Sequence, residues 1–355
     1  MCNRARAVTG GTLPHVAQHS FFKHDATSCN CVILLGPTAC GKTGIGVALA
    51  LRFNGEIISA DSRQVYKGLD IGSGKDLSEY IVDGVAVPHH LIDIVDVSTE
   101  YNVYSYQQDF YRVFPEIVAR RKLPVVVGGT GMYLDAIIRK YDLLTVPRNE
   151  ALRAELEKKS LKELNALLLS LRPDLHTRED LRHKERCIKA IEIAECMRSP
   201  QADEIRSNMA PCPDIRPLVI GTTLEREELR ERISKRLSER LDCGMIDEVA
   251  CLHEEGASWQ RLETLGLEYK FVAEYLQGKI ATKTELYEKL NVAIRQFAKR
   301  QETWFRGMER KMEKLDIPIH WLPRIVDKEA RVRAAAELIA EHVAHGRIGH
   351  FCAMT

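Results

Sequence analysis

The chain has 355 residues, of which 45% are apolar and 28% are charged, and its formal net charge is +1. These values are typical of a soluble globular protein with one large domain or two smaller ones. The small net charge excludes a general electrostatic attraction to nucleic acid, so any such site must be a local basic patch. The chain has no run of about 18 apolar residues, which argues against a membrane-spanning helix. Its 10 cysteines are scattered without a C-x-x-C pair, a pattern typical of the reducing cytoplasm.

Residues 1–29 carry no secretory signal pattern, and we expect them to form a disordered N-terminal extension. Strand-like apolar runs then alternate with helix-like segments, which predicts an α/β core with a mostly parallel sheet. We assign residues 30–146 and 217–325 to this core. The predicted strands cover residues 32–35, 56–60, 90–94, 124–127, 217–221 and 319–322.

Residues 147–216 interrupt the alternation of strands and helices. Prolines flank this segment, and leucine and isoleucine recur within it at helical spacing, so we expect a helical insertion into the core. Two long amphipathic helices are predicted next, over residues 225–249 and 284–306. We expect residues 326–355 to form a C-terminal helix and a short tail.

A complete phosphate-binding loop follows the first predicted strand, with the sequence Gly36-Pro37-Thr38-Ala39-Cys40-Gly41-Lys42-Thr43. In such a G-x-x-x-x-G-K-T loop, backbone N–H groups at the start of a helix surround an anionic diphosphate. Lys42 supplies a positive charge to the terminal phosphate, and the Thr43 hydroxyl is the expected ligand of a Mg²⁺ ion. The motif by itself is compatible with ATP, GTP or another diphosphate.

Two further turns are expected beside this loop, because ligands of α/β sheets bind where the carboxyl ends of parallel strands meet. Asp61 follows the second predicted strand, where its carboxylate could bind Mg²⁺, act as a general base or cap the next helix. Ser62 and Gln64 could together contact the edge of a base. Thr130 lies in Gly128-Gly129-Thr130-Gly131, after the fourth predicted strand, and is a candidate hydroxyl ligand.

Two groups of basic residues each have a structural and a functional interpretation. The segment 295–306 mixes basic and aromatic side chains, and forms either a solvated helix face or a contact surface for a phosphate backbone. Arg232, Arg236 and Arg240 recur every four residues, and form either a solvated stripe or a clamp for a diphosphate.

Six ordered motifs together resemble the tRNA dimethylallyltransferases, also called tRNA isopentenyltransferases. The resemblance covers roughly residues 31–322, and its specificity comes from the order of the set. The motifs are G-P-T-A-C-G-K-T at 36–43, D-S-R-Q-V-Y-K-G-L-D-I-G-S at 61–73, H-H-L-I-D-I at 89–94, V-G-G-T-G-M-Y at 127–133, R-C-I-K-A-I-E-I at 186–193 and R-Q-F-A-K-R-Q-E-T-W-F-R at 295–306.

The resemblance implies a P-loop NTPase-like fold and the transfer of a prenyl group. The dimethylallyl group of dimethylallyl diphosphate would move to the N6 amine of the adenosine on the 3′ side of the tRNA anticodon, typically in tRNAs that read codons beginning with U. Diphosphate would be released. The catalytic residues would then be Asp61 as general base, Thr130 and Lys42. Residues 36–43 and Arg232 would bind the diphosphate, with Mg²⁺ held by Thr43.

The resemblance also implies contacts with the anticodon stem-loop of tRNA, made by the helical insertion and by segments 263–268 and 295–306. The implied tRNA-binding residues are Asp61, Ser62, Arg63, Gln64, Thr130, Arg153, Lys184, Glu185, Arg186, Cys187, Ile188, Arg295, Lys299 and Arg300. Residues 265–270 depart from the Gly-Tyr-[Lys/Arg] turn of many members. Residues 323–355 lack the Cys and His pairs of a zinc finger, which favours the bacterial type, and we expect a cytoplasmic monomer.

Three alternative functions are compatible with parts of this pattern. An adenylate isopentenyltransferase would use the same chemistry on a free nucleotide, but it would not need the insertion 147–216 or the basic helix 295–306. A P-loop small-molecule kinase or ATPase would bind ATP in the same loop, but Asp61-Ser62-Arg63-Gln64 and the lack of a lid disfavour it. A non-catalytic RNA-binding protein would not need an intact phosphate-binding loop.

Overall fold

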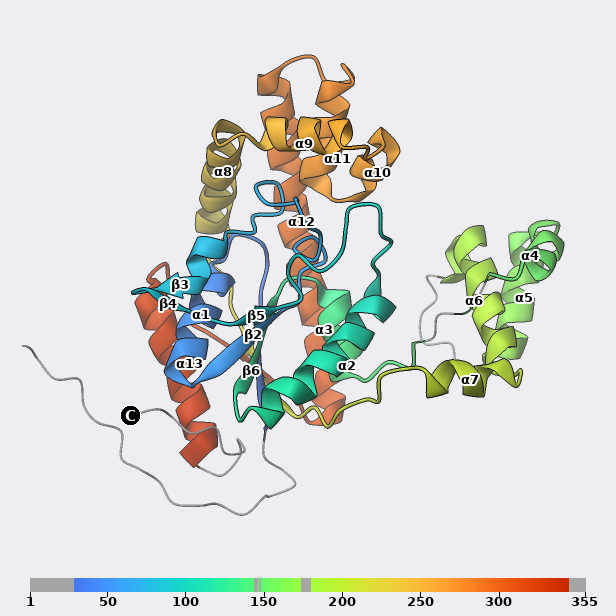
Figure 1. Ribbon diagram of the computed structural model, residues 1–355, viewed down its shortest axis with the longest axis horizontal. Helices are drawn as coiled ribbons and strands as arrows, with labels where there is room; N and C mark the ends of the chain where they lie inside the picture. Colours follow the sequence, from blue (N-terminus) through green and yellow to red (C-terminus); the bar gives the residue numbers. More distant parts are fainter. Residues whose placement is uncertain (1–28, 144–145, 147, 174–179, 345–355) are drawn as a thin grey trace, which may run out of the picture.

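The computed structural model describes residues 29–143, 146, 148–173 and 180–344 of the chain. The predicted N-terminal extension, apart from residue 29, and the end of the predicted C-terminal tail lie outside these residues. In the described part of the chain, six parallel strands form the central sheet (Figure 1). Their spatial order is β5 (His89–His90), β2 (Gly55–Ser59), β6 (Leu123–Gly128), β1 (Cys31–Leu35), β7 (Pro217–Gly221) and β8 (Ile319–Trp321).

The strand that carries the phosphate-binding loop, β1, lies in the middle of the sheet. Its Val32 pairs with Val125 of β6 on one side and with Leu218 of β7 on the other. All residues of β1, β2 and β6 are buried, as expected for parallel strands that are covered on both faces. The predicted α/β core with a parallel sheet is therefore confirmed.

The predicted strand over residues 90–94 is shorter than expected. Only His89 and His90 pair with β2. The backbone then becomes left-handed at Leu91 (φ 60°) and again at Asp93 (φ 55°). Because this conformation lies outside the β region, the strand ends at His90.

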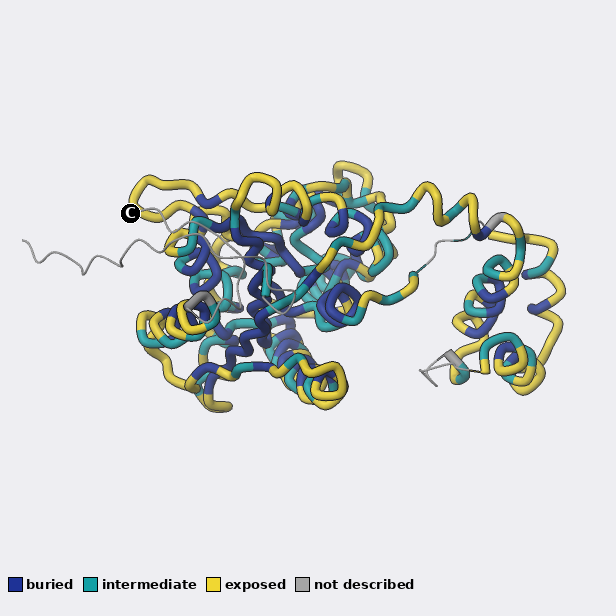
Figure 2. Tube along the Cα trace, turned by 90° about the horizontal axis from the view of Figure 1, so that it is seen from below, coloured by how far each residue is buried: buried dark blue, intermediate teal, exposed yellow. Residues whose placement is uncertain are grey.

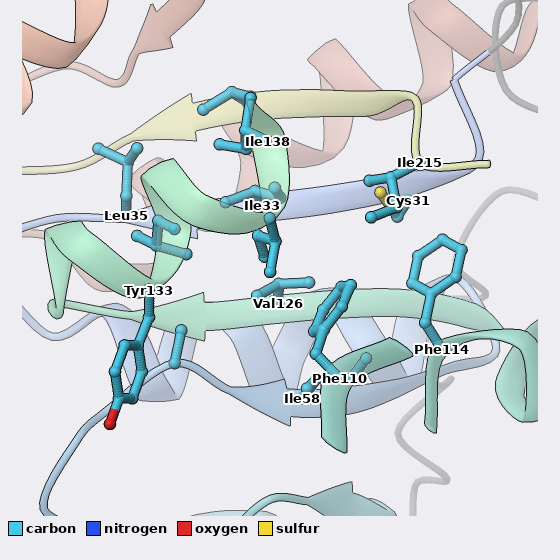
Figure 3. Packing of buried hydrophobic residues seen from close by; sticks show 14 of the residues in the cluster. Cys31, Ile33, Leu35, Ile58, Phe110, Phe114, Val126, Tyr133, Ile138 and Ile215 are labelled. Atoms are coloured by element: carbon cyan, nitrogen blue, oxygen red, sulfur yellow. The ribbon is translucent and has the colours of Figure 1, made fainter. Parts of the chain in front are cut away.

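Helices cover both faces of the sheet, because successive side chains of a strand point to opposite sides. Cys31, Ile33 and Leu35 of β1 enter one core with α2 (Val103–Ala119), α3 (Gly131–Ile138) and the end of α12 (Lys283–Met312). Figure 3 shows the rings of α2 lying against this face. Val32 and Leu34 enter a second core with α1 (Lys42–Arg52) and α13 (Lys328–Ala344).

A further layer of helices packs beyond the carboxyl ends of the strands (Figure 1). It consists of α8 (Arg226–Asp242), α9 (Met245–Glu254), α10 (Trp259–Thr264), α11 (Leu267–Leu276) and the first part of α12. The single helix predicted over 225–249 is wrong, because Gly244, with φ of 98°, separates α8 from α9. The helix predicted over 284–306 is confirmed and extends further at its C-terminal end.

A lobe of helices stands beside the sheet, where the sequence predicts a helical insertion (Figure 2). It contains α4 (Glu150–Glu157), α5 (Leu161–Leu171), the 3₁₀ turn η2 (Asp180–Arg182), α6 (Lys184–Met197) and α7 (Gln201–Ser207). These helices share a small apolar core of their own. Its buried members are Leu156, Leu164, Leu168, Cys187, Ile188 and Ile191.

Short elements complete the described residues. The 3₁₀ turn η1 (Leu77–Tyr80) precedes an antiparallel hairpin of β3 (Ile81–Val82) and β4 (Val85–Ala86). The 3₁₀ turn η3 (Glu313–Leu315) follows α12. None of the helices described here is both long enough and apolar enough to cross a membrane.

Candidate active site

A cavity of about 570 Å³ opens at the carboxyl ends of β1, β2 and β6. The turns after these three strands each contribute to its wall, and α12 adds Arg300 and Trp304. The lining residues that the sequence predicts in the three turns are Thr38, Lys42, Thr43, Asp61, Ser62, Arg63, Gln64 and Thr130. The structure thus brings together residues that lie far apart in the chain.

The loop between β1 and α1 has the shape that its motif requires. Ala39 and Gly41 have left-handed backbones, with φ of 62° and 80°, and α1 begins immediately afterwards at Lys42. The N–H groups in the first turn of a helix have no partner inside the helix, so they are available to an anion. Lys42 Nζ donates a hydrogen bond to the Pro37 carbonyl oxygen at 3.1 Å, which keeps its charge at the loop.

The remaining residues of the loop support it from behind. Gly36 lies so close to the strand end of β7 that a Cβ there would stand 2.2 Å from the Thr222 carbonyl oxygen. The Cys40 side chain is fully buried, so this residue can offer a ligand only its backbone. Of the predicted diphosphate-binding residues, the cavity wall therefore contains the side chains of Thr38, Lys42 and Thr43.

Asp61 and Thr130 belong to two turns that are tied to each other. The Thr130 hydroxyl accepts a hydrogen bond from the Ser62 N–H at 3.0 Å. One carboxylate oxygen of Asp61 accepts a hydrogen bond from the Arg63 N–H at 2.9 Å, which fixes the orientation of the carboxylate. No helix follows Asp61 before residue 77, so the residue caps a turn and not a helix. The Gln64 amide oxygen accepts a hydrogen bond from Ser59 Oγ at 3.0 Å.

Gln301 of α12 links the two glycine-containing turns, although none of the sequence motifs singles it out. Its amide oxygen accepts a hydrogen bond from the Thr38 N–H at 2.8 Å, and its amide nitrogen donates to the Gly129 carbonyl oxygen at 2.9 Å. Only 8% of Gln301 is exposed. Gln301 lies in the basic and aromatic segment 295–306, but the pattern of this segment does not show which of its residues faces the sheet.

The arginine row of α8, which the sequence suggests as a clamp for a diphosphate, reaches the cavity with two of its three members. Arg236 and Arg240 line the cavity wall. Arg232 lies one turn earlier and does not line the wall. Its Nε donates to Glu228 at 2.7 Å on the same helix. Arg236 and Arg240 therefore face the cavity, whereas Arg232 lies at the edge of the loop, with Nη1 3.9 Å from the point where a Cβ of Gly41 would stand.

These two arginines also fix the glycine-rich end of the segment 61–73. Arg236 donates to the Gly74 carbonyl oxygen at 3.2 Å, and Arg240 donates to the Gly72 carbonyl oxygen at 3.3 Å. Arg240 also lies 3.4 Å from a carboxylate oxygen of Glu268. Burial, together with the neighbouring charge of Arg236, lowers the pKa of Arg240 to about 10. Burial raises the pKa of Glu268.

Three of the predicted tRNA-binding side chains are buried inside the insertion. Arg153 is 8% exposed, donates to Glu192 at 2.8 Å and contacts Glu185. Cys187 and Ile188 belong to the apolar core of the insertion and are at most 1% exposed. Arg153 links α4 to α6, and Cys187 and Ile188 pack in the apolar core of α4, α5 and α6, so these side chains support the insertion and present little surface to a ligand.

The other predicted tRNA-binding residues outside the cavity are accessible to different degrees. Lys184, Glu185, Arg186 and Lys299 are exposed. Arg295 is half-buried between α12 and α8, where it donates to Ser234 Oγ at 2.7 Å. The predicted segment 263–268 contributes to the cavity wall.

Two family models match the chain. The model described as IPP transferase matches residues 64–308, and the model described as isopentenyl transferase matches residues 29–85. Together they cover the phosphate-binding loop, the Asp61 turn, the insertion and most of α12.

Curated relatives resemble the chain over most of its length. It is 54% identical to a "tRNA dimethylallyltransferase 2" of Treponema denticola over 294 residues, which are 82% of this chain and 95% of the relative. It is 50% identical to a "tRNA dimethylallyltransferase 2" of Trichlorobacter lovleyi over 308 residues, which are 87% of this chain and 96% of the relative.

Solved structures of other proteins have folds similar to the fold of this chain. A crystal structure of the full-length tRNA isopentenylpyrophosphate transferase of Bacillus halodurans superposes with a TM-score of 0.63 at 33% identity, and the match covers 89% of this chain and 97% of that one. A eukaryotic dimethylallyltransferase acting on tRNA superposes with a TM-score of 0.73 over 91% of this chain and 81% of that one. Its identity is 23%, so this second likeness bears on the fold alone.

Proposed function

The chain belongs to the IPP transferase family, and we propose that it transfers the dimethylallyl group of dimethylallyl diphosphate to an adenosine of tRNA. The acceptor is the N6 amine of the adenosine on the 3′ side of the anticodon, in tRNAs that read codons beginning with U. The names of the curated relatives support this reaction. The observation that carries it is one cavity in which a phosphate-binding loop faces the Asp61–Thr130 turns.

The diphosphate end of the cavity suits a leaving group. In the reaction, the bond between the allylic carbon and the diphosphate oxygen breaks, and that oxygen takes the electron pair. Positive groups that neutralise the developing charge lower the barrier. The loop supplies such groups with Lys42 and its N–H groups, and α8 supplies Arg236 and Arg240.

The acceptor amine needs a general base, and Asp61 takes this role. The N6 amine of adenine is a poor nucleophile because its lone pair is delocalised into the ring. As the new N–C bond forms, the amine must lose a proton, and the Asp61 carboxylate accepts it as general base. The Arg63 N–H holds this carboxylate in a fixed orientation. Thr130, whose hydroxyl is tied to the same turn, orients the adenosine beside it.

Mg²⁺ fits the donor set at the loop. Thr43 lies in the first turn of α1 and lines the same cavity as Asp61. Hydroxyl, carboxylate and diphosphate oxygens are the ligands that this ion prefers. Thr43 would hold Mg²⁺, which would supply additional charge neutralisation to the leaving diphosphate.

The tRNA approaches from the side of α12 and the insertion. Lys299 and Arg300 on α12, and Lys184 and Arg186 on α6, are the exposed cations that contact its phosphates. An adenosine in an unpaired loop can leave its stack at small cost, so it can enter the cavity. Arg153, Cys187 and Ile188 act indirectly, by holding the helix that presents the cations. We expect a monomer that works in the cytoplasm.

The base assignment is tested by transfer of labelled dimethylallyl diphosphate to unmodified tRNA. Asp61→Asn keeps the hydrogen bond from the Arg63 N–H but removes the base, and should lower kcat by about 10²–10⁴ with unchanged affinity for tRNA. The matched control is Asp96→Asn, because Asp96 is exposed and pairs with Lys67 at the surface. Turnover of Asp61→Asn equal to that of the control would contradict the assignment.

A further inference from the structure

The C-terminal helix α13 sends a buried arginine to the back of the phosphate-binding loop. Arg331 is 1% exposed. Its Nη1 donates to the Cys40 carbonyl oxygen at 2.6 Å and to Thr222 Oγ1, at the end of β7, at 3.3 Å. Figure 1 shows α13 lying beside α1. One guanidinium thus joins the loop, the sheet and the last helix of the described chain.

The bond to Cys40 determines where the following amide points. In a trans peptide the carbonyl C=O and the next N–H point in opposite directions. Because Arg331 holds the Cys40 carbonyl on the inner side of the loop, the Gly41 N–H is directed away from Arg331. The other guanidinium nitrogen, Nη2, lies 3.3 Å from the point where a Cβ of Gly41 would stand, so the guanidinium packs directly against this turn.

Among the described residues, no carboxylate forms a direct ion pair with the Arg331 guanidinium, and the carboxylate that acts on it through its charge is Asp327 of the preceding turn. In the described part of the chain its hydrogen bonds go to a carbonyl and a hydroxyl oxygen. Arg232 Nη1 lies 3.9 Å from the same Gly41 Cβ position, so a second cation stands nearby. Burial and the Arg232 charge lower the pKa of Arg331. A buried cation without a carboxylate partner is costly unless an anion compensates it.

A third cation comes from the same helix. Lys328, one turn before Arg331, places its Nζ 3.0 Å from the point where a Cβ of Gly44 would stand, in the first turn of α1. A cation near a helix N-terminus is unfavourable by itself, because the helix dipole is positive there. When an anion is bound at the N-terminus of α1, the interaction of the Lys328 charge with this site becomes favourable.

We propose that Arg331 is a positioning residue for the diphosphate site, and that Lys328 adds to the positive potential of that site. Arg331 orients the Gly41 N–H toward the bound diphosphate and contributes a charge from behind the loop. The proposal rests on the proposed function, since it takes the ligand of the loop to be a diphosphate. The helix α13 would thereby take part in substrate binding, although it is far in sequence from the phosphate-binding loop.

The test is calorimetric titration of the full chain with inorganic diphosphate in the presence of Mg²⁺. Arg331→Gln loses both the charge and the Nη1 donor to the Cys40 carbonyl oxygen, because its side chain is shorter, and should weaken binding about tenfold. Arg331→Lys retains the charge but lacks the planar guanidinium with its several N–H donors, and should weaken binding about threefold. Lys328→Gln, a change at an exposed side chain, should weaken binding about twofold, and less at high salt. Arg333→Gln removes a charge at an exposed position of the same helix, and should bind like the wild type.

The outcomes separate this proposal from the proposed function. Wild-type affinity in Arg331→Gln would overturn it, and if that variant does not fold, wild-type affinity in Arg331→Lys would do so. An equal loss in Arg331→Lys and Arg331→Gln would also overturn the role of the charge. The KM for tRNA serves as the control for intact structure, because a general loss of structure would raise it. We expect it to stay unchanged in all of these variants. Failure of the wild type itself to bind diphosphate would contradict the proposed function instead.

Discussion

The amide oxygen of Gln301 accepts the hydrogen bond of the Thr38 N–H at 2.8 Å, although the two residues are 263 positions apart in the chain. The amide nitrogen of Gln301 donates to Gly129. A helix outside the sheet therefore sets the distance between the phosphate-binding loop and the Thr130 turn, which carry the two halves of the proposed reaction.

Gln301→Leu should lose both stability and turnover. The change leaves a buried N–H and a buried carbonyl without their partner, which costs about 1–3 kcal/mol for each group. Urea unfolding measures the stability, and the prenyl transfer assay measures kcat. The control is Gln296→Leu, an exposed position on the same helix. A Gln301→Leu variant as stable as this control would show that the bridge contributes nothing.

The connections to the insertion are held by two adjacent glutamines of α2. Gln107 Nε2 donates to the Tyr141 carbonyl oxygen at 2.9 Å on the entering chain. Gln108 Oε1 accepts from the Ala210 N–H at 2.8 Å on the leaving chain. Both side chains are at most 4% exposed. These two neighbouring side chains thus tie both connections of the insertion to α2.

The double variant Gln107→Leu/Gln108→Leu should raise the KM for tRNA severalfold while diphosphate affinity stays unchanged. The reason is that the insertion loses its fixed orientation, whereas the loop after β1 does not depend on α2. Steady-state kinetics and diphosphate titration separate the two effects. Glu116→Gln, at an exposed position of α2, is the control. If both affinities fell together, α2 would be supporting the whole core and not the orientation of the insertion.

Arg153→Met should destabilise the insertion selectively. It leaves Glu192, which is 5% exposed, as a buried carboxylate without its cation, at a cost of about 3–5 kcal/mol. Limited proteolysis should then cut within residues 150–207, and tRNA binding should fall. Arg148→Met is the control, because Arg148 pairs with Glu150 at the surface. Unchanged protease resistance in Arg153→Met would be incompatible with this role.

Glu56 should make stability depend on pH. Burial raises the pKa of this carboxyl group, but hydrogen bonds from Arg120 and His90, both at 2.7 Å, outweigh it and hold the pKa below its usual 4.5. Because the folded pKa is the lower one, the contribution is complete above about pH 4.5 and is lost as the pH falls through the folded value.

The measurement is the melting temperature of the wild type and of Glu56→Gln across this range. At pH 7 the wild type should melt higher, and the difference should shrink as the pH falls below about 4.5. A difference that is the same at both ends of the range would exclude Glu56 as its source.

The fold could be predicted from local signals, because parallel strands are nearly continuous apolar runs. The runs at 32–35, 124–127 and 217–221 correspond closely to β1, β6 and β7. The breaks at Leu91 and Gly244 were not predicted. Each depends on one residue with a left-handed backbone, and a hydrophobic pattern carries little information about that conformation.

The site was predicted where a motif fixes the local backbone. Thr38, Lys42, Asp61 and Thr130 all line the cavity, since each lies in a turn that follows a strand or at the residue that ends that turn. Residues on helices were harder to select, because many side chains of a helix repeat at similar spacing. The choice between Arg232 and Arg236, or of Gln301 within 295–306, depends on how the helix packs, which only the tertiary structure shows.

The most direct measurement is the transfer of radiolabelled dimethylallyl diphosphate by the wild-type chain, with unmodified tRNA, AMP and ADP as parallel acceptors and Mg²⁺ present. We predict label in tRNA alone, on the adenosine that follows the anticodon. Label in the free nucleotides would indicate an adenylate isopentenyltransferase. Label in none of the three acceptors would contradict prenyl transfer and leave a phosphate-binding loop that serves ATP chemistry.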